Sequence, residues 1–183
     1  MNGNEVHENR DDTDNPVGLD NLGRLPEHVP RPDWAELAPE AFKALVRVDT
    51  AAKRGLDPVL LNLVKIRASR INHCALCLDM HSRDALAAGE SAGRILQLGA
   101  WRESRHFYTA GEVAAIELTE AIAVFTDSPV PDEVYARAAA EFSESELARP
   151  VVAITMLNGW NGFGVSTCLV PGHCTSPPDR TTP

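Results

Sequence analysis

Two cysteines and a histidine lie close together in the chain and carry the reactive groups from which a function is most readily inferred. Cys74 and Cys77 are separated by two residues, and His81 follows four residues after Cys77. On a helix, steps of three and four residues place side chains along one face. If Asn72 or His73 ends a preceding turn, Cys74 stands near a helix N-terminus, where free backbone N–H groups lower the pKa of a thiol.

A thiol pair of this kind suits reversible dithiol–disulfide chemistry. One sulfur attacks a peroxide or a disulfide, and the other resolves the intermediate. His81 can exchange a proton with Cys77 and assist its attack as a general base. Two other interpretations of the pair stay open. The cysteines can pack as small apolar side chains, or they can bind zinc with His81 and with His73 or Cys168.

Helical patterns extend through the middle of the chain and must position these residues. The predicted helices begin at capping residues or at prolines near the first turn: Pro39, Asp57-Pro58, Thr109 with Glu112, Pro131, and Ser143 with Glu146. Gly55 stands where a helix-terminating glycine belongs. Alternating strand patterns are nearly absent. The sequence therefore predicts an all-α fold.

Length and composition suit one helical domain with loose ends. The chain has 183 residues, of which 44% are hydrophobic, enough for a sizeable core. Residues 1–30 are acidic and poor in large apolar side chains, so we expect a flexible segment there. We place the helical domain at residues 31–174 and a flexible tail, rich in Pro, Ser and Thr, at residues 175–183.

The charge and the apolar pattern exclude several classes of protein. A net charge of -9 argues against nucleic-acid binding. The short basic stretches 67–70 and 102–105 are interpreted as solvated helix faces. No apolar run approaches the ~20 residues of a membrane-spanning helix, and the N-terminus lacks the features of a signal peptide. We therefore expect a cytoplasmic protein, in which a close cysteine pair is more often catalytic or metal-binding than structural.

A longer stretch around the cysteines resembles a known family. The run from Leu61 to Ala85 is similar to the core signature of the alkylhydroperoxidase D-like, or carboxymuconolactone decarboxylase, proteins. Similarity continues in Gly89-Glu90, in Ala100–Ser104 and in the segment that begins at Thr109, and it precedes the signature in residues 38–45 and 55–58. In all it covers about residues 35 to 172. The resemblance implies a small helical bundle that assembles into homo-trimers or homo-hexamers.

The resemblance assigns roles to the three residues. Cys77 matches the peroxidatic cysteine of the family, Cys74 the resolving or relay-side cysteine, and His81 a histidine of the proton relay. Two positions depart from the family pattern. Asn62 stands where a glutamate is usual, and Leu76 stands where some members have a histidine.

Because an amide cannot accept and return a proton at neutral pH, the carboxylate end of the relay is missing at position 62. Glu90, Asp79 and Glu103 are candidates to replace it. With Asn62 in place we expect slow peroxide consumption, which Asn62→Glu should accelerate.

The function implied is that of a peroxiredoxin-like thiol oxidoreductase that reduces hydroperoxides or disulfides. It would need no bound cofactor, and an external dithiol would regenerate it. The alternative is a redox sensor or binding scaffold that keeps the thiols without peroxidase turnover. A muconolactone-type decarboxylase ranks last, because decarboxylases of this fold generally lack the cysteine pair.

Residues near the C-terminus complete the expectations. Trp160 is expected in the core or in a subunit interface. Assembly into an oligomer would cover three apolar side chains, namely Trp101, Trp160 and Phe163. Gly162 replaces an arginine of the family pattern. Cys168 and Cys174 are interpreted as incidental thiols that do not contribute to turnover.

Overall fold

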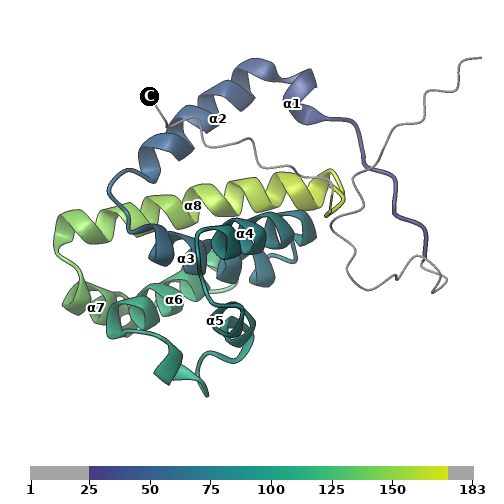
Figure 1. The fold of residues 1–183 in the computed structure, drawn as a ribbon. Coiled ribbons are helices and arrows are strands. Elements are labelled where there is room, and N and C mark those ends of the chain that lie inside the picture. Colours follow the sequence, from purple (N-terminus) through teal and green to yellow (C-terminus); the bar gives the residue numbers. More distant parts are fainter. Residues whose placement is uncertain (1–24, 173–183) are drawn as a thin grey trace, which may run out of the picture.

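Helices account for the regular structure of residues 25–172, the part of the chain that this computed structural model describes (Figure 1). No strand occurs within that range, so the predicted all-α fold is confirmed. The helices are α1 (Trp34–Leu37), α2 (Pro39–Ala52), α3 (Pro58–Ile71), α4 (Ala75–Ala87), α5 (Ala92–Gln97), α6 (Ala110–Ala123), α7 (Asp132–Glu141) and α8 (Glu144–Ser166), with short 3-10 helices η3 (Leu98–Ala100) and η4 (Arg105–Phe107).

The capping residues act as their sequence positions predict. The Asp57 side chain accepts a hydrogen bond from the backbone N–H of Leu60 at 2.9 Å and starts α3. Complete capping boxes start α6 at Thr109 and α8 at Ser143. Gly55 follows the end of α2 with a φ of 74°, a conformation that glycine adopts without steric cost.

Helices α3 and α6 form the centre of the bundle, and the core divides into two clusters around them. One face of α3 packs with α6, α7 and α8 through Leu60, Val64, Leu118 and Ile154, among others. The opposite face packs against α4, α5 and the segment after it, where Trp101 is 1% exposed. Both faces of α3 are therefore buried, which holds the helix that leads into the cysteine pair rigidly in place.

A partly buried ion-pair cluster corrects two of the expectations. Glu120 of α6 accepts hydrogen bonds from Arg67 of α3, from the indole N–H of Trp101 at 2.6 Å, and from Arg102. Arg67 is thus part of the inter-helix packing rather than of a solvated face. Trp101 is covered within one chain and gives no support for assembly, so the trimer or hexamer stays a prediction.

The N-terminal part of the described chain crosses the C-terminal helix. Helices α1 and α2 lie over α8 (Figure 1), and the rings of Trp34 and Phe163 stack with centroids 3.8 Å apart. Before α1, the backbone N–H of Arg31 donates to the carbonyl of Thr167 at 2.9 Å. Most of the segment predicted to be flexible, residues 1–24, and the whole predicted tail, 175–183, lie outside the described residues.

No helix within residues 25–172 is long and apolar enough to cross a membrane.

A network of partly and fully buried amides joins the end of α3 to α8. The Asn72 side-chain amide donates to the side-chain oxygens of Asn158 at 2.8 Å and Asn161 at 2.9 Å. Asn161, which is fully buried, donates in turn to the Ser69 hydroxyl at 3.3 Å. The network therefore fixes the place where α3 stops and the chain turns toward the cysteines.

Replacement of Asn161 by leucine should destabilise the protein. The change leaves one donor of Asn72 and the hydroxyl of Ser69 without their partner, which costs about 1–3 kcal/mol of unfolding free energy. Chemical denaturation measures this loss. Thr155→Val, which removes an exposed hydroxyl from the same helix, is the control and should change stability by less than ~0.5 kcal/mol. Equal effects of the two changes would contradict the role assigned to Asn161.

Candidate active site

A tight turn between α3 and α4 positions the cysteine pair. His73 has a left-handed φ of 55°, which reverses the chain after Asn72 and makes Cys74 the N-cap of α4. The N–H of Cys77 points at the Cys74 sulfur, 3.3 Å away. The two sulfurs are joined in a disulfide. The predicted placement of Cys74 at a helix N-terminus is confirmed, and in this oxidised state neither sulfur is free to bind zinc.

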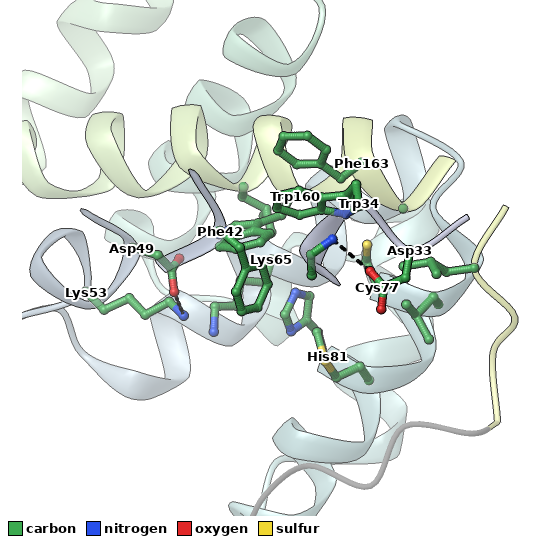
Figure 2. A pocket seen from close by; sticks show the side chains of 16 residues that line it. Asp33, Trp34, Phe42, Asp49, Lys53, Lys65, Cys77, His81, Trp160 and Phe163 are labelled. Atoms are coloured by element: carbon green, nitrogen blue, oxygen red, sulfur yellow. Dashed lines mark hydrogen bonds and ion pairs between the residues drawn. The ribbon is translucent and has the colours of Figure 1, made fainter. Parts of the chain in front are cut away.

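Cys77 and His81 open into the same pocket. The pocket has a volume of about 400 Å³ and is lined mainly by apolar side chains. Figure 2 shows Cys77 toward one end of it, Asp49 and Lys53 toward the other, and His81 between them. Of the three side chains predicted to share one face, Cys77 and His81 border this space, which is large enough for a small organic molecule. Cys74, the N-cap of α4, does not line it.

Aromatic rings from three helices form one wall of the pocket. Trp34 of α1, Phe42 of α2, and Trp160 and Phe163 of α8 all line it, and each ring lies within 6.3 Å of at least two others. The expectation that Trp160 belongs to the core or to a subunit interface is therefore incomplete, because the indole borders the pocket beside the thiols.

His81 is buried and neutral in this state. Its side chain is 7% exposed, and among the described residues its Nδ1 atom has no hydrogen-bond partner. Burial, followed by the positive charges of Lys65 and Lys53, lowers the pKa of His81 to about 3. At neutral pH the imidazole is thus unprotonated and can accept a hydrogen bond, and in this oxidised state it is a weak base.

Three charged side chains stand at the pocket end opposite the disulfide. Asp49 and Lys53 form a salt bridge across one turn of α2. Lys65 of α3 lies beside them, and its pKa falls to about 8, first because of burial and then because of Lys53. Asp49 opposes this effect, but only in part. The site therefore combines a disulfide with a neutral histidine and a cationic end.

Three residues of this pocket were not predicted from the sequence: Asp49, Lys53 and Lys65. A signal for Lys65 exists, since it is the single charge in the apolar run Leu60–Ile66 of a helix that is buried on two sides. Asp49 and Lys53 resemble an ordinary surface pair four residues apart. Nothing in their spacing indicates that α2 folds over the pocket.

Asn62, which stands where the family usually has a glutamate, does not line the pocket at Cys77. Asn62 borders a separate pocket of about 360 Å³ together with Glu90, Arg94 and Glu112. A glutamate at position 62 would face these two carboxylates before it faced the disulfide. Of the carboxylates considered as substitutes, Glu90 pairs with Arg94, and neither Asp79 nor Glu103 lines the pocket at Cys77. Two other carboxylates line that pocket, Asp49 and Asp33.

The other cysteine of the pair faces a second opening. Cys74 lines a smaller pocket of about 230 Å³ that it shares with His28, His73 and Cys168. Cys168, interpreted from the sequence as incidental, is therefore a neighbour of the thiol pair in space. Cys174 lies outside the described residues.

Helix α8 lies directly on the disulfide at Gly164. A Cβ atom at this position would stand 2.7 Å from the Cys74 sulfur and 3.3 Å from the Cys77 sulfur. Contact this close requires glycine, because two non-bonded heavy atoms rarely approach so near.

Gly164→Ala should lower the stability of the oxidised protein by about 1–3 kcal/mol, the usual cost of overpacking. Thermal or chemical unfolding of the disulfide form measures it. Gly162→Ala on the same helix meets nothing within 4 Å and should instead raise stability by up to ~1 kcal/mol, since alanine favours helix. The same sign for both variants would show that α8 does not rest on the disulfide.

The buried histidine should make stability depend on pH. His81 has a folded-state pKa of about 3 against about 6.5 in the unfolded chain. Below pH 6.5 the unfolded state binds the proton that the folded state excludes, so stability falls as pH decreases from about 6.5 toward 3. Between pH 7.5 and 5.0 the wild type should lose on the order of 1–2 kcal/mol more unfolding free energy than His81→Gln. The exposed His106→Gln is the control and should behave as the wild type does.

One family profile and two known proteins match this chain in sequence. The sequence profile of the carboxymuconolactone decarboxylase family matches residues 39–121. The uncharacterised protein YdfG of Bacillus subtilis is 36% identical over 137 residues, which cover 74% of this chain and 92% of YdfG. The uncharacterised protein YnjA of Escherichia coli is 32% identical over 128 residues, 69% of each chain.

A solved structure shares the fold. A protein of unknown function from Agrobacterium tumefaciens, ATU0492, described as a candidate antioxidant defence protein AhpD, superposes with a TM-score of 0.75 at 33% identity. The match covers 78% of this chain and 98% of that one. The family expected from the thiol-pair signature is thus confirmed by sequence and by fold: the chain belongs to the carboxymuconolactone decarboxylase family.

Proposed function

We propose that the protein is a peroxiredoxin-like thiol oxidoreductase that reduces hydroperoxides, or disulfides, through Cys74 and Cys77. The observation that supports this most strongly is the disulfide at the start of α4, whose Cys77 opens into an apolar pocket beside a neutral, buried His81. The description of the Agrobacterium protein as a candidate antioxidant defence protein agrees with it.

The first half of the reaction takes place at Cys77. As a thiolate, Cys77 attacks the distal oxygen of the hydroperoxide, the O–O bond breaks, and the sulfur becomes a sulfenic acid. The alkoxide that leaves takes up a proton and departs as an alcohol. The N-terminus of α4 favours the thiolate, because its free N–H groups carry partial positive charge.

The second half of the reaction forms the observed disulfide. The thiolate of Cys74 attacks the Cys77 sulfur, the S–O bond breaks, and water leaves. An external dithiol then returns two electrons and two protons by thiol–disulfide exchange and is itself oxidised to a disulfide. No bound cofactor takes part in these steps.

His81 suits the role of proton shuttle because its pKa depends on the charge of Cys77. In the oxidised state no negative charge stands at the sulfurs, and the two lysines keep the pKa of His81 low. A thiolate at Cys77, one helical turn away, adds a negative charge that raises this pKa. The imidazole can therefore take the thiol proton as the thiolate forms and pass it to the alkoxide.

Peroxide consumption with dithiothreitol as donor tests the proposal. Cys77→Ser should abolish turnover, and Cys74→Ser should leave a sulfenic acid at Cys77 that dimedone traps. His81→Gln should lower kcat by roughly 10²-fold, as expected for loss of a general acid–base group, whereas the exposed His106→Gln should not.

Mass spectrometry after mild peroxide treatment should show the Cys74–Cys77 crosslink in the wild type and in Cys168→Ser. A crosslink from Cys74 to Cys168 would instead place the third cysteine in the cycle. A wild type that forms the Cys74–Cys77 disulfide but consumes no hydroperoxide would favour a redox sensor or binding scaffold.

A further inference from the structure

The charges of the pocket at Cys77 and His81 are not balanced along its length. At the end away from the disulfide, Asp49 and Lys53 neutralise each other in their salt bridge. Lys65, which lines the same end, forms no ion pair of its own within the described residues. At the other end Asp33 is engaged as the N-cap of α1, where it accepts from the N–H of Ala35 at 2.8 Å. One cation without an ion pair of its own, its charge only partly offset by Asp49 and Asp84, therefore faces an apolar space.

We propose that Lys65 is an anion-binding subsite and that the pocket takes amphipathic substrates, namely hydroperoxides that carry a carboxylate on an apolar body. This inference rests on the proposed function for the reaction and adds the class of substrate. The hydroperoxide group would lie at Cys77, the apolar body against the aromatic wall, and the carboxylate at the ammonium of Lys65.

Desolvation of the ammonium supplies the driving force. A half-buried cation without a partner is held at a cost, and a carboxylate that enters the pocket offsets this cost through a charge-assisted hydrogen bond. The charged and titratable groups around Lys65 are Asp49 on α2, Lys53 at the C-cap of α2, and His81 and Asp84 on α4. Together with burial they leave the pKa of Lys65 at about 8, so the nearby carboxylates do not compensate it fully.

The shape of the pocket selects the rest of the molecule. Trp34, Phe42 and Trp160 offer apolar surface between the two ends, and the volume of about 400 Å³ lies in the range of pockets for small organic ligands. Cys77 and the Asp49–Lys53 pair stand at opposite ends in Figure 2. A substrate that reaches both must carry its two polar groups on either side of an apolar chain or ring.

Ligand binding to the oxidised protein tests the anion-binding subsite separately from the thiol reaction. Octanoate and the uncharged octanamide are the probes, and the fluorescence of Trp34 and Trp160 in the pocket wall is the readout. Octanoate should bind at least about tenfold more tightly than octanamide, as expected for one charge-assisted contact.

Lys65→Met should reduce this ratio to about one, and Lys65→Arg should preserve most of it. Lys43→Met removes an exposed lysine of α2 and is the matched control, which should keep the wild-type ratio. Equal affinity of the wild type for the two probes, or an unchanged ratio in Lys65→Met, would overturn the subsite.

The affinity for octanoate should also depend on pH with a definite sign. Binding requires the ammonium form, and the bound carboxylate raises the pKa of Lys65 in the complex. The affinity should be constant between pH 6 and 7 and fall by up to roughly tenfold per pH unit above about pH 8. A loss of affinity at the same pH in Lys65→Met would assign the titration to another group.

Turnover gives a second readout. The ratio of kcat/KM for a carboxylate-bearing hydroperoxide to that for cumene hydroperoxide should fall about tenfold in Lys65→Met. If the wild type consumes cumene hydroperoxide without preference for the carboxylate, the subsite is wrong while the proposed function stands. If it consumes neither but binds octanoate through Lys65, the proposed function fails and the subsite stands. Equal loss with both substrates would make Lys65 part of the thiol chemistry and would overturn its role as a specificity residue.

Discussion

The structure of the site depends on the close contact between the C-terminal part of α8 and the N-terminus of α4. Gly164 lets the backbone of α8 lie on the two sulfurs, and the amide of Asn72 ties the preceding turn to the same helix. Together these contacts hold the strained turn at His73 that makes Cys74 a helix N-cap. These contacts therefore define the place of the cysteine pair relative to α8 and the pocket.

The pocket then acts on the thiols through charge and burial. Two lysines and an apolar lining keep His81 neutral in the oxidised state. The same lining excludes water from Cys77, which is 5% exposed. Because electrostatic interactions are stronger where water is excluded, a single charge gained at the sulfur or at Lys65 changes proton affinity across the whole site. In the proposed reaction, redox state, proton transfer and choice of substrate are thereby linked in one small space.

Short-range features were predictable from the sequence. Capping residues act within four residues of themselves, so the starts of α3, α6 and α8 follow directly from Asp57, Thr109 and Ser143. The spacing of Cys74, Cys77 and His81 likewise determines that the second cysteine and the histidine share one helical face. These residues, the all-α fold and the family follow from local periodicity, capping and an extended signature.

Tertiary structure alone decided what surrounds the thiols. Asp49 and Trp34 reach the pocket because α1 and α2 fold back over α8, more than a hundred residues later in the chain (Figure 1). Asn62 is one helical turn from Lys65, yet it faces a different pocket, since the rotation of α3 is set by packing on both of its sides. Local sequence determines which residues form a helix and which of them share a face. Which partner that face meets depends on long-range packing, because burial of apolar surface is non-directional and is settled only by the whole bundle.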